Sequence, residues 1–208
     1  MLSLREINTE SLPNRSWVNE RLTFTHGYGL TLGPVNEVTT VGQPVLFVRD
    51  LPPVTTVDLK VDEPSIYYGE RSSDYALVKT DQPEFHYPRG EDNVTTTYDG
   101  TGGVPIGGFF RRLLFAIRFG ASDIVFTNQL NPESRIMFHR QIGERVRKVA
   151  PFLQYDSDPY AVIADGRLFW IQDAYTTTTN YPYATPFGAR GINYIRNSVK
   201  VVIDAYHG

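Results

Sequence analysis

Cysteine is absent from all 208 residues of this chain. That absence excludes a disulfide framework, a zinc site built on thiolates and a nucleophilic thiol. Long apolar runs are missing as well, because the most apolar segment, residues 109–120, is interrupted by Arg111, Arg112 and Arg118. Such a segment cannot cross a bilayer, which requires about 20 mostly apolar residues in a helix.

A strong excess of one charge is also missing. The formal net charge of −3 is too small and of the wrong sign for general binding to polyanions, so we expect no nucleic-acid partner. The charge is nevertheless unevenly spread. Residues 1–104 hold 8 Lys/Arg and 15 Asp/Glu, whereas residues 105–208 hold 12 and 8. The positive excess therefore belongs to the second half, mainly between residues 111 and 148.

What is present is typical of a folded globular chain, with 41% hydrophobic and 21% charged residues. Runs rich in β-branched and aromatic residues predict strands, separated by Gly- and Pro-containing turns. These runs are residues 21–25, 45–48, 66–68, 75–78, 160–164, 168–175 and 199–206. Strands, then helices, then strands again, without βαβ alternation, predict an α+β fold of mostly antiparallel strands with two or three central helices.

Two helices are predicted in the centre of the chain. The apolar residues at 109, 110, 113, 114 and 117 recur at helical spacing, and Gly120 is placed where a helix would end. For the second helix, Asn131 is a suitable N-cap, Pro132 suits the first helical position and Pro151 would end it. We therefore expect helices over residues 109–119 and 132–150.

The last third of the chain predicts a hairpin and a free edge. Asp165-Gly166 between two apolar runs is a strong signal for a two-residue β-turn. Residues 199–206 form a good strand that meets a turn signal at His207-Gly208, after which no return strand follows. We expect this strand to pair on one side only, with its other edge exposed or in contact with a neighbouring copy.

Several local motifs resemble uncharacterised protein family 0182 of bacteria. They are Thr25-His26-Gly27-Tyr28-Gly29, Ile66-Tyr67-Tyr68-Gly69-Glu70, Gly100-Thr101-Gly102-Gly103-Val104-Pro105, Pro132-Glu133-Ser134-Arg135-Ile136, Asp156-Ser157-Asp158-Pro159-Tyr160 and Asn193-Tyr194-Ile195-Arg196-Asn197-Ser198. The matches cover nearly the whole chain in one order and are weakest over residues 176–191.

The resemblance implies topology rather than chemistry. Members of that family are large membrane proteins with several N-terminal spans and a long extracytoplasmic region. By this resemblance, residues 1–208 are a single α+β fragment of that region, truncated at both ends, on the extracytoplasmic side of the cell membrane. Its partner would then be its own transmembrane region. No catalytic residues carry over from the family.

A glycine-rich segment before the first predicted helix is a candidate anion site. Backbone N–H groups around Gly103, Gly107 and Gly108 could hold a phosphate or carboxylate at the helix start, with Arg111 and Arg112 adding charge. The spacing matches neither a P-loop nor the GxGxxG motif. The alternative is a tight structural turn that lets the helix pack closely, and the motif alone favours this alternative.

The basic residues 135–148 have two interpretations. Arg140 and Lys148 are spaced to pair with Glu144 on a solvated helix face, which is the more common role of such a pattern. Beside a membrane, the same residues could contact anionic lipid head groups.

Histidine is too sparse to suggest a metal site. The four histidines, at positions 26, 86, 139 and 207, form no HxxxH or HExxH pair, so we expect no metal and no cofactor. His26, between a predicted strand and two glycines, is the best single candidate for a functional side chain. No GxSxG elbow or SxxK pair supports serine hydrolase chemistry.

Two functional hypotheses remain open at this point. The first is a non-enzymatic extracytoplasmic module for ligand sensing, scaffolding or interaction. The second is an envelope hydrolase or transferase with an Asp/Glu/His site that no motif identifies. A deep pocket that gathers two carboxylates, or a carboxylate with His26, would favour the second.

Overall fold

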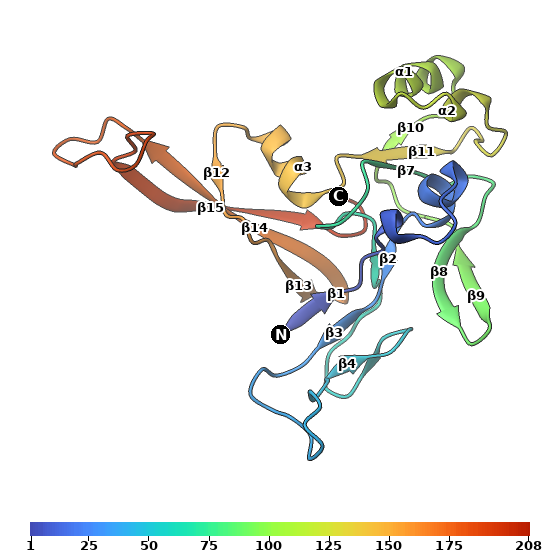
Figure 1. Ribbon diagram of the computed structural model, residues 1–208, viewed down its shortest axis with the longest axis horizontal. Coiled ribbons are helices and arrows are strands. Elements are labelled where there is room, and N and C mark those ends of the chain that lie inside the picture. The colour runs from blue at the N-terminus through green and yellow to red at the C-terminus, as the bar shows by residue number, and fades with distance from the viewer.

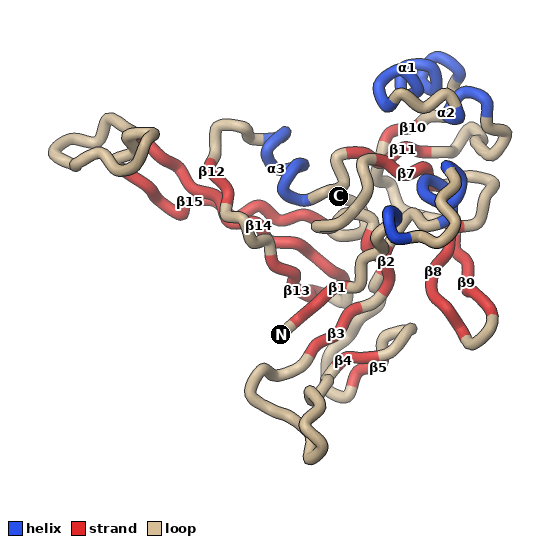
Figure 2. Tube along the Cα trace, in the orientation of Figure 1, coloured by secondary structure: helices blue, strands red, loops and turns tan.

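The computed structural model describes residues 1–208 as an α+β fold in which every strand pair is antiparallel, as the sequence predicts. Figure 2 shows how much of the chain is strand and loop. The helices are α1 (Phe109–Phe119), α2 (Asp123–Phe126) and α3 (Ile142–Val149), with a 3-10 turn at Thr9–Ser11 and a π-helical turn at Asn19–Thr23. No helix is both long and apolar enough to cross a membrane.

The longest sheet is built around β14 (Arg167–Thr178). Its neighbours are β13 (Tyr160–Ala164) and β12 (Gln154–Tyr155) along one edge, and β15 (Tyr194–Asp204) along the other. The turn from β13 to β14 is the predicted Asp165-Gly166, with φ of 49° and 75°. Two successive positive φ values match the right-handed twist of a tight hairpin, which confirms the prediction.

The outer edge of β15 is unpaired along its whole length. Ten residues of β14 pair with β15, across a β-bulge near Ala174 and Tyr175, and no other strand pairs with β15. Beyond the body of the sheet, β14 and β15 continue outward as a two-stranded arm, at the left of Figure 1. The prediction of a C-terminal strand paired on one side is therefore confirmed, and the strand begins five residues earlier than expected.

A second sheet separates two hydrophobic cores. It consists of β10 (Val104–Pro105), β11 (Arg135–Phe138) and β7 (Tyr75–Val78), in that order. Ile136 and Leu77 face a core closed by α1 and α2, whereas Met137 and Val78 face the larger core around Trp170. In Figure 1, α1 and α2 lie beside this sheet, at one corner of the molecule. The alternation explains why all four residues of β7 are buried.

The predicted helix over residues 132–150 is wrong in its first half. The segment Arg135–Phe138 is β11, and only Ile142–Val149 is helical. Asn131 does not cap a helix. Its side chain accepts a hydrogen bond from the Glu133 N–H (2.9 Å) and forms a turn that leads into the strand. Pairing on both edges, with β7 and β10, outweighs the local helix signals.

Short strands complete the fold. They are β1 (Leu2–Leu4), β2 (Gly27–Tyr28), β3 (Leu30–Leu32), β4 (Val48–Arg49), β5 (Val54–Thr55), β6 (Ser65–Ile66), β8 (Glu84–Arg89) and β9 (Asp92–Thr96). The strand expected over residues 21–25 is instead the π-helical turn and its exit, because Leu22 packs inward beneath β7. A long loop between β3 and β4, residues 33–47, projects from the body at the bottom of Figure 1.

The glycine-rich segment brings the backbone of α1 close to the start of β11. A Cβ on Gly107 would lie 2.5 Å from the Pro132 carbonyl oxygen, so no larger residue fits there without movement. The neighbouring Gly108 is the N-cap of α1, with φ −84°, and has open space around it.

We predict that Gly107→Ser destabilises the protein by about 1–3 kcal/mol, the usual cost of forcing extra atoms into a packed contact. Gly108→Ser, the matched control, should be neutral or slightly stabilising, because serine is a favourable N-cap in this conformation. Urea denaturation of both variants measures the difference. Equal midpoints would show that the Gly107 contact is not constraining.

Candidate functional site

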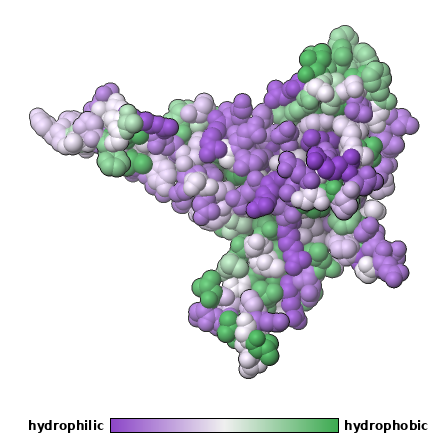
Figure 3. All heavy atoms as spheres, viewed as in Figure 1, coloured by the Kyte–Doolittle hydropathy of each residue, from purple (hydrophilic) through white to green (hydrophobic).

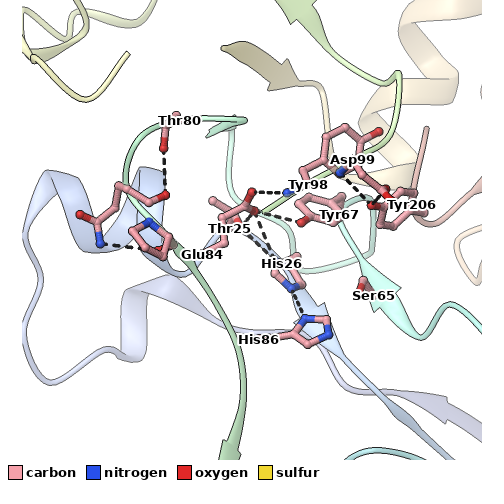
Figure 4. A network of polar contacts seen from close by, with 12 residues as sticks. Thr25, His26, Ser65, Tyr67, Thr80, Glu84, His86, Tyr98, Asp99 and Tyr206 are labelled. Atoms are coloured by element: carbon pink, nitrogen blue, oxygen red, sulfur yellow. Dashed lines mark hydrogen bonds and ion pairs between the residues drawn. The ribbon is translucent and has the colours of Figure 1, made fainter. Parts of the chain in front are cut away.

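The most unusual feature of the interior is a carboxylate with no exposed surface. Glu84, the first residue of β8, is completely buried (0% exposed), although glutamate is among the residue types least often buried. Figure 4 shows the side chains that gather around it from distant parts of the chain. We take this network as the candidate functional site because it also contains His26, the histidine that the sequence singles out.

Every group around Glu84 donates a hydrogen bond to it. The Tyr67 hydroxyl (2.9 Å) and the Thr25 hydroxyl donate to Oε2, and the Tyr98 backbone N–H donates to Oε1 (2.9 Å). A carboxylate that accepts three such bonds is stabilised in the interior, where an unpaired charge would be very costly. Burial and the nearby Glu84 carboxylate together raise the pKa of Tyr67 well above its usual value.

His26 connects Glu84 to the surface. Its Nδ1 lies 2.9 Å from the Thr25 hydroxyl and 3.5 Å from Glu84 Oε2, and its Nε2 lies 3.1 Å from His86 Nδ1. Because the Thr25 hydroxyl gives its proton to Glu84, His26 Nδ1 carries the proton that Thr25 accepts. His26 Nε2 and His86 Nδ1 share the next hydrogen bond, so contacts connect His86 to Glu84 through His26 and Thr25.

His86 forms the outer end of this chain. It is half-buried beside Tyr28 and Tyr87, with ring centroids 4.1 and 5.2 Å away. Desolvation by burial, with a smaller contribution from the neighbouring His26, lowers the pKa of His86 to about 4. This environment therefore disfavours protonation of His86 at neutral pH.

The network can hold a proton in place but has little room for a substrate. His26 is 1% exposed, and both of its ring nitrogens face protein side chains. The cavity that His26 and Arg140 line is small, with room for about one water molecule. Glu84 is not among the residues lining that cavity. A general base requires a free nitrogen within reach of a substrate, and His26 offers none in this geometry.

Arg140 is a second charged residue in the interior, where the sequence pattern predicts a solvent-exposed one. It was expected on a solvated helix face, but it precedes α3 and is 3% exposed. Its guanidinium donates to the Tyr67 carbonyl (2.7 Å), to the Ser73 hydroxyl (2.9 Å) and to the Thr25 carbonyl. Burial lowers the pKa of Arg140 to about 10. The expected partner Glu144 instead lies 2.6 Å from His139 Nδ1.

The arginines of the predicted anion site donate hydrogen bonds to backbone carbonyls of nearby segments. Arg111 donates to the Pro105 carbonyl (3.1 Å) and Arg112 to the Leu130 carbonyl (2.8 Å). Gly103, with φ 74°, and Gly107 both touch neighbouring backbone, and Gly108 caps α1 without a side chain. The structure thus gives close packing as the role of Gly103 and Gly107, and the anion site stays a prediction.

The sequence could not have identified Glu84. Residues 81–98 are polar and contain two prolines, which favours loops, whereas the structure forms the hairpin of β8 and β9 there. The one available signal was the spacing of Glu84 and His86, which a regular strand places on one face. In the structure a β-bulge between Phe85 and Tyr87 interrupts that alternation. The structure brings no three His, Asp or Glu side chains together as metal ligands.

Comparison with known proteins places the whole chain in one family. The family model described as Uncharacterised protein family (UPF0182) matches residues 1–208. A UPF0182 protein of Geotalea uraniireducens is 53% identical over 209 residues, and one of Pelotomaculum thermopropionicum is 50% identical over 210 residues. Each match covers 100% of this chain, which spans 23% of the length of these relatives. No solved structure matches.

We predict that Glu84→Gln lowers the free energy of unfolding by about 2 kcal/mol or more. The amide would turn an NH2 group toward donors that already point at it, which leaves a buried group unsatisfied. Glu133→Gln, at an exposed position, is the matched control and should have almost no effect. Urea denaturation at pH 7 compares the two, and equal stabilities would contradict a stabilising role for the Glu84 carboxylate.

We also predict that His86 makes the fold less stable as the pH falls from 7 to 5. In the unfolded chain His86 takes up a proton near pH 6.5, but in the folded protein its pKa is about 4. Between these values the unfolded state binds more protons, so acid favours unfolding. His86→Phe retains an aromatic ring and should lose less stability over this interval. Thermal melts at both pH values provide the test, and parallel losses would refute it.

Proposed function

We propose that this chain, which belongs to the uncharacterised protein family UPF0182, is an interaction domain on the extracytoplasmic side of a bacterial membrane protein. In this role it holds other parts of a larger assembly through two projecting arms and carries out no chemistry of its own. The first arm is the extension of β14 and β15 with its connecting loop, residues 176–196. The second arm is the loop of residues 33–47.

The observation that carries this proposal is the apolar end of the first arm. Tyr183 is fully exposed and Phe187 is 85% exposed at the tip. Large aromatic groups in water are unfavourable, so clusters of them usually mark surfaces that become covered. The unpaired edge of β15 runs along the same arm and offers backbone donors and acceptors to an added strand.

The tip of this arm is held in shape before any partner binds. The Asn193 side chain accepts from the Tyr181 N–H (3.0 Å) and donates to the carbonyls of Tyr181 (2.9 Å) and Ala184 (3.2 Å). Tyr181 also stacks on Tyr194, with 4.9 Å between ring centroids. A loop fixed in this way loses little conformational entropy on binding, which favours recognition.

The second arm repeats the pattern at a different corner of the molecule. Val35, Val38 and Val41 are all more than two-thirds exposed along residues 33–47. Figure 3 shows apolar surface at the lower end of the molecule, where Figure 1 places the loop of residues 33–47. Two separated apolar arms on one chain support a role in holding several neighbours together.

An envelope hydrolase or transferase is the less supported alternative. It would require a substrate to reach His26 or Glu84, yet both are buried and bound to one another through Thr25. Arg140 fixes the same region from the opposite side through the Thr25 and Tyr67 carbonyls. These contacts favour a structural role for the network.

Single-cysteine labelling in the full-length protein tests both the side of the membrane and the contacts of the arms. This chain has no cysteine of its own, and any cysteine elsewhere in the full-length protein is first replaced by serine. Glu91→Cys, in the exposed β8–β9 turn, should react with a membrane-impermeant maleimide in intact cells. Val38→Cys and Tyr183→Cys should react more slowly in the full-length protein than in the isolated chain, because partners cover both arms. Ala76→Cys is the buried control and should react only after denaturation.

Two results would overturn the proposal separately. Labelling of Glu91→Cys only after cell lysis would contradict the extracytoplasmic location. Equal reaction rates of Val38→Cys and Tyr183→Cys in the full-length protein and the isolated chain would contradict the interaction role of the arms.

A further inference from the structure

Helix α1 is apolar on two opposite sides, and the core explains only one of them. Phe115, Ala116 and Phe119 face the smaller core, where they meet residues of β7, β11 and α2. The other side carries five large apolar side chains in successive turns, all exposed: Phe109, Phe110, Leu113, Leu114 and Ile117. An exposed apolar face of this size usually marks a surface that becomes covered, so the outer face of α1 lacks a partner within this chain.

The exposure of the outer face is too large to be incidental. Phe110 is 79% exposed and Ile117 is 72% exposed. Phe126, at the end of the adjacent α2, is exposed beside them. Figure 3 shows this surface as a continuous apolar area at the upper corner of the molecule. The sequence pattern correctly predicts the helix, and the structure places these five apolar residues in solvent.

The charged residues of α1 itself are all positive. Residues 100–122 contain no Asp or Glu and three arginines, in a chain whose net charge is −3. At 100° per residue, Arg111 and Arg118 lie along one margin of the apolar stripe, next to Leu114. Both are exposed, and Arg118 also lies over the rings of Phe119 and Phe138, at 5.6 and 5.3 Å.

The helix is folded and fixed before anything binds to its outer face. Gly120 ends it in the left-handed conformation, and its N–H donates to the carbonyls of Ala116 and Ile117. Phe115 and Phe119 stack with rings nearly parallel, 6.2 Å apart, and hold the inner side on the core. A binding partner therefore does not have to supply the free energy of helix formation.

We propose that the outer face of α1 inserts into the interfacial region of a lipid bilayer that contains anionic head groups. An exposed face at a corner, with no polar group to specify register, fits a fluid apolar medium better than a shaped protein groove. When the apolar side chains enter the bilayer, Arg111 and Arg118 lie at the level of the lipid head groups. Their positive charge then favours anionic lipid. This surface is separate from the two arms, so the inference stands or falls independently of their role.

The test uses the chain itself with vesicles of phosphatidylcholine, with or without phosphatidylglycerol. Leu114→Cys carrying an environment-sensitive fluorophore should shift to the blue with the anionic vesicles and be quenched by brominated lipid tails. The same label on Glu91→Cys should report no change. Arg111→Gln combined with Arg118→Gln should reduce the preference for anionic vesicles.

Substitution of the apolar face provides the second measurement. The variant with Phe110→Ser, Leu114→Ser and Ile117→Ser should bind anionic vesicles at least about tenfold more weakly in co-sedimentation, because three apolar side chains no longer leave water. Its urea midpoint should match that of the unchanged chain, since all three side chains are exposed. The matched control replaces Val35, Val38 and Val41 by Ser in the second arm and should bind vesicles normally.

Three outcomes would overturn the proposal. The first is that the chain binds equally to vesicles with and without phosphatidylglycerol, or that the variant at Phe110, Leu114 and Ile117 binds anionic vesicles as strongly as the unchanged chain. The second is self-association in sedimentation velocity that this variant abolishes while vesicles bind neither form, which would make the face a contact between copies. The third is absence of both vesicle binding and self-association, which would leave a protein partner as the occupant.

Discussion

The buried Glu84 carboxylate is the constraint on which the organisation of the larger core depends. A charge in the interior is tolerated only where donors surround it, and here the donors are Thr25, Tyr67 and Tyr98. Thr25 lies 59 positions before Glu84 in the chain, and Tyr98 lies 14 positions after it. Arg140 fixes the carbonyls of Thr25 and Tyr67 from the other side. The short strands near this point have few ladder hydrogen bonds of their own, so these polar contacts hold them in register.

Elements whose signals are local could be predicted from the sequence. Asp165-Gly166 needs positive φ at two adjacent residues, and few other structures satisfy that requirement. Gly120 ends α1 because a residue without a Cβ adopts the left-handed conformation at low cost. The fold class followed from the order of such elements.

Elements decided by distant contacts could not be predicted in the same way. Asn131-Pro132-Glu133 is a favourable helix start, yet the next residues form β11 because β7 and β10 offer hydrogen bonds on both of its edges. His26 was identified by its place between a strand and two glycines, but Glu84 and Arg140 were not identified as its neighbours. A buried charge leaves no pattern in one sequence, because the residues that compensate it approach only in three dimensions.

The distribution of apolar surface connects this fold to its function. A chain that buries Tyr67, Tyr98 and Ile136 almost completely has enough apolar residues to form its cores. It nevertheless leaves Phe110, Tyr183 and other large apolar groups in water at three separate corners. Exposed apolar groups of this size do not stabilise the isolated fold and favour aggregation, so a stabilising role within the domain cannot explain them. Because the three surfaces lie on different projections, one partner of ordinary shape cannot cover all of them. This distribution is the physical ground for proposing that more than one kind of surrounding covers the domain.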